Sequence, residues 1–319
     1  MPRLPRPETD SPAAPAKRGI PRAVQGPLYM VAAALGFSIM NLLIREASSE
    51  LEPLQIAFFR NFFAVLAMAP WLLRAGLRRS FATRHFKLHV ARATIGFVAM
   101  VCWFYSIALL PLAEATALNF TVPLFATVGA ALILGEVVRA RRWTATIVGF
   151  LGVLIILQPG FKGVETIMLL PVVAAFFMAG VTLLIKRLSD TDAPMTIVLY
   201  MNVLLTGVSA IPALLVWHWP SPGTWLILLL LGAVGAISQI WVVRAYQRAD
   251  ASAILPFDYA RLPFIALLAF LFFGEIPDIW TWIGGAVIAA SAIYIAQREA
   301  QVARERATAG AASRAPEGR

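Results

Sequence analysis

Four charged side chains interrupt apolar stretches of this sequence and are the first candidates for chemistry. They are Arg60, Arg92, Asp258 and Arg261. A charge at the centre of a bilayer costs about 2.5–3.5 kcal/mol on insertion scales, so each one needs a physical reason. Arg60 fits either a contact with an anion or substrate, or a clamp between helices that binds carbonyls or Glu46. Arg92 lies near a basic loop, and we expect its side chain to extend to the lipid headgroups.

Asp258 and Arg261 are three residues apart, so a helix places them on one face, where they can pair. Asn119 precedes Asp258 by an offset of 139 residues that recurs in the sequence. A carboxylate and an amide at related positions suit recognition of a polar heterocycle or a proton relay. The alternative is a structural ion pair that neutralises both charges inside the protein.

Glu114, Pro123 and Pro263 are candidates for gating. Glu114 follows Pro111 at the expected start of a helix, where the helix dipole favours a negative charge. It is either a gating carboxylate or an acid in contact with water. Each of the other two prolines removes a backbone hydrogen bond, which is tolerated where cavity water or another group binds the freed carbonyl. A hinge, a kink that faces a substrate, and a kink needed only for packing are the alternatives.

Aromatic residues on the same segments could stack against a planar ring, although packing and interface roles are common for them in membrane helices. The candidates for a binding cavity are Trp103, Tyr105, Phe120, Trp241 and Tyr259. We expect no metal site, because Cys102 is the single cysteine and His85 and His89 have no metalloprotease pattern around them. We expect no cofactor, and the absence of a Gly-x4-Gly-Lys-Ser/Thr loop disfavours an ATP-driven pump.

The composition indicates what positions these residues. Apolar residues make up 60% of the 319 and charged residues 14%, against about 25% charged in soluble domains. A helix that spans a bilayer needs about 20 mostly apolar residues. Ten such segments predict an all-α integral membrane protein: Leu28–Ile44, Leu54–Leu73, His89–Leu110, Ala113–Leu134, Arg142–Leu157, Thr166–Ile185, Met195–Trp217, Trp225–Tyr246, Ser252–Phe273 and Trp280–Ala296.

The basic residues predict the orientation. Of 27 Lys and Arg, 22 lie in the two termini and in alternate loops, Arg45 and Lys162 lie in the other loops, and three lie inside apolar segments. The positive-inside rule then places both termini in the cytoplasm. This scatter of charge also argues against a nucleic-acid partner, and it makes the lipid bilayer the expected surroundings.

The two halves of the sequence repeat each other. Gly135-Glu136 matches Gly274-Glu275 at an offset of 139, and Pro53 matches Pro194 at an offset of 141. Five helices per repeat is an odd number, so the two units have opposite orientations, an inverted repeat that many secondary transporters share. We expect a disordered tail at 1–26, repeats at 27–160 and 161–297, and a polar tail at 298–319.

The Gly-Glu helix ends, together with the segments 57–61 and 103–117, give the sequence a resemblance to the drug/metabolite transporter superfamily, ten-helix EamA type. Within it the resemblance is to bacterial importers of riboflavin and of S-adenosylmethionine. It implies a central cavity lined mainly by the third, fourth, eighth and ninth predicted helices, with the fifth and tenth peripheral.

The resulting hypothesis is a carrier in the bacterial inner membrane that moves a small organic metabolite by alternating access, with riboflavin uptake first. Uptake of S-adenosylmethionine and export of amino acids or drugs are the alternatives. A membrane-embedded enzyme is disfavoured, because no nucleophile, base or metal cluster stands at one membrane depth. Gly149/Gly152 and Gly284/Gly285 suit close helix packing or a homodimer through the fifth and tenth helices.

Overall fold

The computed structural model describes residues 22–76, 80–133, 140–157, 166–189, 191–248 and 257–312, and these ranges contain no strand. A short 3-10 helix, η1 (Thr166–Leu169), precedes α8. The helices are α1 (Arg22–Ala47), α2 (Pro53–Ala75), α4 (Phe86–Leu109), α5 (Leu112–Asn119), α6 (Val122–Ile133), α7 (Ala140–Leu157), α8 (Leu170–Ser189), α9 (Pro194–Leu215), α10 (Pro222–Arg248), α12 (Arg261–Phe273) and α13 (Ile279–Ala312).

The helical, membrane-type fold predicted from composition is confirmed. Every predicted apolar segment overlaps a helix. Six helical spans are long and apolar enough to cross a membrane, and three shorter apolar helices accompany them in the described ranges. Large apolar side chains such as Ile211, Leu215 and Leu271 are more than half exposed, as expected of surfaces that face lipid rather than water.

Two predicted helices are not continuous. The segment Ala113–Leu134 forms two helices, because α5 ends at Asn119 and α6 begins only at Val122. In the segment Ser252–Phe273, α12 begins at Arg261, and residues 249–256 lie outside the described ranges. In both places the interruption lies just before a proline, whose ring and missing N–H disfavour a regular helix there.

The helices at the two ends of the chain are longer than predicted. α1 begins at Arg22, so residues 22–26 belong to a helix rather than to the predicted tail, of which 1–21 lie outside the described residues. α13 continues to Ala312, well past the predicted end of the second repeat at 297. Its extension is rich in Ala, Arg, Glu and Gln, which are good helix formers.

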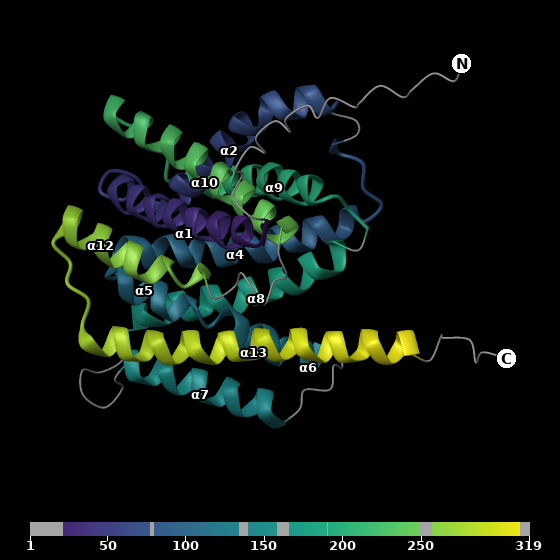
Figure 1. Ribbon diagram of the computed structural model, residues 1–319. Coiled ribbons are helices and arrows are strands. Elements are labelled where there is room, and N and C mark those ends of the chain that lie inside the picture. Colours follow the sequence, from purple (N-terminus) through teal and green to yellow (C-terminus); the bar gives the residue numbers. More distant parts are fainter. Residues whose placement is uncertain are drawn as a thin grey trace, which may run out of the picture.

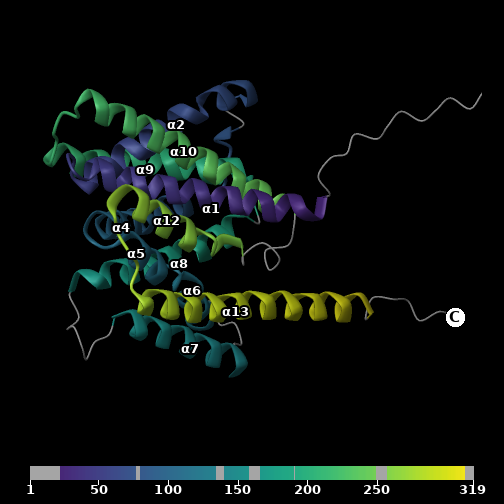
Figure 2. The same ribbon diagram turned by 60° about the vertical axis from the view of Figure 1, so that its left-hand side comes forward.

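The helices pack as a bundle in which neighbours in space are distant in sequence (Figure 1). α1 packs along α10, α4 along α8, α2 against α9, and α7 against α13. The first residues of α1 and the last residues of α13 point to the same end of the bundle (Figure 2). Each partnership joins an element from the first half of the chain to one from the second.

Two glycines explain the close contact between α7 and α13. A Cβ added at Gly152 would lie 2.9 Å from the carbonyl oxygen of Gly284, and one added at Gly284 would lie 2.6 Å from that of Gly152. Any side chain at either position would force the helices apart. These predicted small-residue positions therefore serve packing within the chain.

Candidate binding cavity

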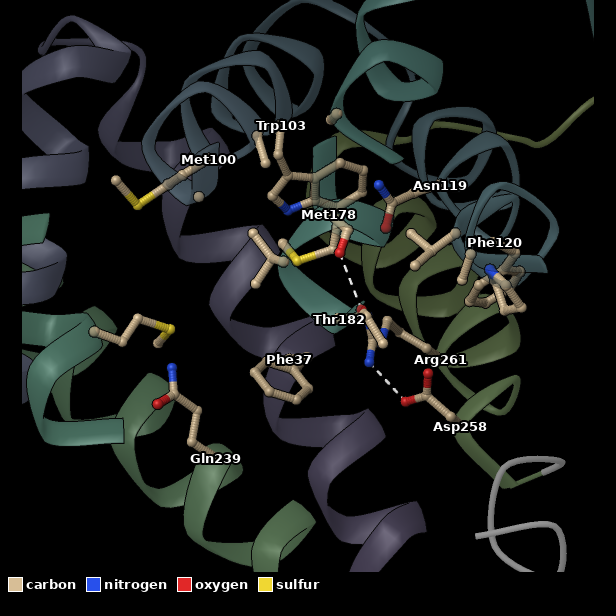
Figure 3. A pocket seen from close by; sticks show the side chains of 18 of the residues that line it. Phe37, Met100, Trp103, Asn119, Phe120, Met178, Thr182, Gln239, Asp258 and Arg261 are labelled. Carbon is tan, nitrogen blue, oxygen red and sulfur yellow. Dashed lines mark hydrogen bonds and ion pairs between the residues drawn. The ribbon is translucent and has the colours of Figure 1, made fainter. Parts of the chain in front are cut away.

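A cavity of about 620 Å³ lies among the helices, within the usual range for small-molecule sites. Its lining comes from both halves of the chain. The first half contributes residues of α1, α2, α4, α5 and α6, and the second half contributes residues of α8, α9, α10, α12 and α13. Figure 3 shows part of this lining. The predicted candidates in the lining are Arg60, Trp103, Asn119, Phe120, Pro123, Asp258, Tyr259 and Arg261. The third (α4), fourth (α5 and α6), eighth (α10) and ninth (α12) predicted helices contribute, as the resemblance implies. α1, α2, α8 and α9 contribute as well, and so does α13, the tenth predicted helix, which the resemblance wrongly places outside the lining.

Asp258 and Arg261 form the ion pair that their spacing predicts. Arg261 Nη2 donates to Asp258 Oδ1 at 2.6 Å, and the guanidinium lies over the Phe37 ring, 4.8 Å from its centroid. Both residues line the cavity together with Asn119 (Figure 3). The pair is partly exposed, with 20% and 29% of the Arg261 and Asp258 side chains accessible, so it can still meet a bound solute.

The two helix interruptions meet beside the cavity. Phe120 lies in the turn between α5 and α6, and Tyr259 lies in the turn before α12. Their rings meet edge to face, with centroids 4.7 Å apart. In a regular helix the N–H of residue 123 would donate to the carbonyl of Asn119. Pro123 has no N–H, so this carbonyl, next to the cavity, lacks that donor. Irregular backbone at this depth is tolerated where it lines such a cavity.

Arg60 combines parts of both hypotheses. Its Nη1 donates to Oδ1 of Asn61 at 2.8 Å and to Oδ1 of Asn202 at 3.3 Å. Each asparagine is itself held, since its Nδ2 donates to a carbonyl four residues earlier in its helix. Arg60 therefore clamps α2 to α9 through amides, rather than through Glu46. It also lines the cavity, and its buried Nε has no partner among the described residues.

The prediction that Arg92 extends to the headgroups is wrong. The residue is 4% exposed and lines the cavity, with Nη1 donating to the Ile197 carbonyl at 3.1 Å and Nη2 at 3.1 Å from Met201 Sδ. His89, one turn earlier on α4, is also buried, 2.7 Å from Asp192, so this face of α4 packs against protein. A sequence signal did exist, since Arg92, Gly96 and Trp103 share one helical face.

Neutral polar and sulfur-bearing residues of the cavity were missed. Asn41 of α1 is 1% exposed, and its Oδ1 has no partner among the described residues, nor does Oε1 of Gln239 on α10. Four methionines also contribute to the lining: Met40, Met100, Met178 and Met201. Amides inside apolar segments were the available signal for the first two, because they too are costly to bury without partners.

Four predicted candidates lie outside the cavity lining. Tyr105 donates to Glu52 Oε2 at 3.3 Å, near the loop between α1 and α2. Trp241 lies beside Gly36 of α1. Glu114 lies on α5, and Pro263 is exposed on α12, and neither lines the cavity.

One end of the bundle, here named the Glu275 end, is joined by a charged cluster across the two halves. Arg45 Nη2 lies 2.8 Å from Glu275 Oε1, and Glu275 Oε2 accepts from the Leu112 N–H at 2.9 Å. Arg45 Nη1 also donates to the carbonyls of Ile107 and Leu110, at 2.7 and 2.8 Å. Glu275, which follows the end of α12, thus links that helix to α1 and α5, whereas its repeat counterpart Glu136 lies outside the described residues.

The loop between α1 and α2 strengthens the Glu275 end. Glu50 accepts from the N–H and hydroxyl of Ser221 at 2.5 and 2.9 Å, and from the hydroxyl of Thr224. These hydrogen bonds, that of Thr224 foremost, lower the pKa of the Glu50 carboxyl. Gln55, in the first turn of α2, forms two further hydrogen bonds with the backbone of His218, at 2.6 and 3.0 Å.

The opposite end, here named the Asp192 end, carries a different cluster. Asp192 Oδ2, in the loop between α8 and α9, accepts from the Thr83 hydroxyl at 2.6 Å and lies 2.7 Å from His89 Nε2. Burial would raise the pKa of Asp192, but the hydrogen bonds with Thr83 and His89 outweigh it and lower that pKa. Tyr200 stacks on the His89 ring, with centroids 4.4 Å apart.

Comparison with known proteins identifies the family. A model described as the EamA-like transporter family matches the chain twice, at residues 24–158 and 165–297. The chain belongs to the EamA-like transporter family. It is 38% identical to a riboflavin transporter of Vibrio cholerae over 285 residues, which cover 88% of this chain and 96% of that protein. It is 29% identical to an S-adenosylmethionine uptake transporter of Rickettsia prowazekii, covering 82% of this chain and 89% of the relative.

A solved crystal structure supports the same fold. It aligns with a TM-score of 0.60 at 18% identity and covers 87% of this chain and 98% of its own. At this identity the likeness concerns the fold alone. Membership of a transporter family agrees with the apolar spans and the internal cavity, and it suggests that the protein is not an enzyme.

Proposed function

We propose that this EamA-family transporter imports riboflavin across the bacterial inner membrane by alternating access. The observation that carries the proposal is the cavity at the two helix interruptions, where aromatic rings, thioethers and amides stand together. The ring system of riboflavin is flat and apolar on its faces and carries hydrogen-bonding groups on its edge. Trp103 and Phe120 offer surfaces for the faces, while Asn41, Gln239 and Asn119 offer groups for the edge.

The proposed architecture is a pair of five-helix units in opposite orientation, at 27–160 and 161–297. Residues of the lining support it, because they pair at the offsets found in the sequence. Phe37, Met40 and Asn41 of α1 correspond at 141 residues to Met178, Val181 and Thr182 of α8, and all six line the cavity. Asn119 and Phe120 correspond at 139 residues to Asp258 and Tyr259.

The proposed topology places both termini in the cytoplasm, so that the Asp192 end is cytoplasmic and the Glu275 end is periplasmic. We propose that the cavity is open toward the cytoplasm in this state. On α10 and α13 the lining residues Gln239, Ala292 and Ile295 lie 13 or more residues after the helix starts, which the proposed topology places at the periplasmic side. The charged cluster at the Glu275 end then closes the periplasmic side.

Within this proposal the predicted sites have distinct tasks. The cavity candidates bind solute, and Pro123 keeps the interruption between α5 and α6 in place. Glu114 and Pro263, which do not line the cavity, stay proposals as gating residues. A homodimer through α7 and α13 also stays a prediction, and it would use their outward faces, because Gly152 and Gly284 face each other within the chain.

Uptake of labelled riboflavin into proteoliposomes tests the proposal, with protein-free liposomes as the control. We expect saturable uptake that excess unlabelled riboflavin abolishes and that aromatic amino acids do not. S-Adenosylmethionine is the second candidate, since a relative at 29% identity is named for its uptake. Saturable flux of S-adenosylmethionine without flux of riboflavin would reverse the choice of substrate.

A further inference from the structure

Two arginines in the wall of the cavity carry charge that no described carboxylate neutralises. Arg60 and Arg92 are 7% and 4% exposed, and neither takes part in an ion pair within the described residues. Taking an unpaired charge out of water costs several kcal/mol, so buried charges are normally paired or fully hydrogen-bonded. A bound group with negative charge is the compensation that both arginines lack.

The partners that the two arginines do have are neutral. Arg60 bonds to two amide oxygens, and Arg92 bonds to one backbone carbonyl and one thioether, which is a weak acceptor. A guanidinium has five N–H donors. The buried Nε of each arginine has no partner among the described residues, so donors are left over at both positions.

The two guanidinium groups contact the same stretch of α9. Arg92 binds Ile197 and Met201, and Arg60 binds Asn202, the residue after Met201. Five residues of helix separate Ile197 from Asn202, a rise of about 7.5 Å. Two buried like charges that line one cavity repel each other in a poorly polar interior, and a bound anion would offset this repulsion.

The third arginine of the cavity is already neutralised. Arg261 is paired with Asp258 at 2.6 Å, so this side of the cavity carries no net charge. Among the described lining residues the excess positive charge therefore stands on the side of α2, α4 and α9. The net charge of the cavity is therefore uneven, with a neutral ion pair at the start of α12 and two unneutralised cations on α2 and α4.

We propose that Arg60 and Arg92 form a subsite for an oxyanion, a phosphate or carboxylate group on the transported solute. The inference rests on the proposed role of the cavity as the substrate site, and it extends the substrate class from neutral flavins to anionic ones. A guanidinium matches the geometry of both groups and can bind them with two hydrogen bonds. Such a cavity accepts planar solutes that carry an anionic group.

Binding to the purified full-length protein tests the subsite. The ligands are riboflavin, its 5′-phosphate ester and inorganic phosphate, and the variants are Arg60→Gln and Arg92→Met. Glutamine keeps a donor for Asn61 and Asn202, and methionine orphans no buried side chain. Arg74→Met is the matched control, because Arg74 is exposed at the end of α2 and lies outside the cavity. Ligand-free melting temperatures are measured for each protein.

We expect the phosphate ester to bind the wild type at least as tightly as riboflavin does. Each cavity variant should weaken the ester at least tenfold and riboflavin less than threefold, with Arg74→Met unchanged. Ligand-free Arg92→Met should melt no lower than the wild type, since it loses an unpaired buried charge. A lower melting temperature with unchanged affinity for the ester would make Arg92 a structural clamp and overturn the proposal.

The subsite and the proposed riboflavin function can fail separately. If riboflavin does not bind but inorganic phosphate raises the melting temperature of the wild type and not of the variants, the subsite stands and the proposed substrate is wrong. If riboflavin binds while the ester and inorganic phosphate do not, the proposed substrate stands and the subsite is wrong.

Discussion

The two ends of the bundle are held together differently. At the Glu275 end, Arg45 and the start of α5 converge on one carboxylate at the end of α12, beside both interrupted helices. At the Asp192 end, the described cluster joins the start of α4 and the residues before it to the loop before α9. In the proposed transport cycle the Glu275 end closes the cavity, and the Asp192 end supports its wall. A carrier that alternates needs such an inequality in each state.

Reversing the charge of Arg45 should have the largest effect on this comparison. In Arg45→Glu two carboxylates face each other where an ion pair at 2.8 Å stood, and two carbonyls lose their donor. We expect initial uptake into proteoliposomes to fall at least tenfold. The double variant Arg45→Glu with Glu275→Arg restores the opposite charges and should recover part of the rate. No recovery in the double variant would mean that the pair does not act as a unit.

Removing the carboxylate of Asp192 should have a smaller effect, and one that depends on pH. The folded-state pKa of Asp192 is lowered, so its stabilising contribution is present above the unfolded value of about 3.9 and is lost as the pH falls through the folded value. The wild type should therefore melt above Asp192→Asn at pH 6, and the gap should narrow below about pH 4. A gap that is constant down to pH 3 would contradict this role.

Two aromatic residues of α4, two positions apart, distinguish the cavity from the Glu275 end. Trp103 lines the cavity, whereas Tyr105 points to Glu52 near the Glu275 end. We expect Trp103→Ala to raise the riboflavin concentration for half-maximal uptake about tenfold, because base-like rings lose about 1–3 kcal/mol without an aromatic platform. Tyr105→Phe removes one long hydrogen bond and should stay within twofold of the wild type.

The smallest effect is expected at Glu50. Glu50→Gln keeps an oxygen acceptor for Ser221 and Thr224 but removes the charge of a partly exposed group in a loop. Charges near the surface contribute little, so uptake at neutral pH should be unchanged within error. Glu50→Ala, which also removes the acceptor at the start of α10, should slow uptake measurably. Equal rates for both variants would mean that the hydrogen bonds of the α1–α2 loop do not help to close the Glu275 end.

The sequence predicted features that follow from local geometry and composition. The helical segments come from apolar length, and the pair of Asp258 and Arg261 comes from their spacing. The burial of Arg92 had a local signal in the helical face that it shares with Gly96 and Trp103, but the contact of the Asp192 loop with His89 on the same helix could not be predicted from local geometry. Asn41 and Gln239 were not predicted, because they carry no charge, although a buried amide without a partner is also costly.

The helix interruptions, too, could be predicted only in part from the sequence. Pro123 and Pro263 mark both positions in the sequence, but a proline is compatible with a kink as well as with a break. The contact between Phe120 and Tyr259 is between residues 139 positions apart, and only the tertiary structure brings the two turns together. Tyr105 and Trp241 were assigned to the cavity by residue type, yet helical phase turns both away from it.

Labelling of a cavity residue from each side of the membrane shows which end of the bundle is closed. Thr182 lines the cavity and is exposed to it, and Cys102→Ala removes the only other thiol. An impermeant thiol reagent should label Thr182→Cys from the cytoplasmic face, with protection by riboflavin, and should not label it from the periplasmic face. Adding Arg45→Glu should open the periplasmic route. Equal labelling from both faces while Arg45 and Glu275 are intact would contradict a carrier closed at the Glu275 end.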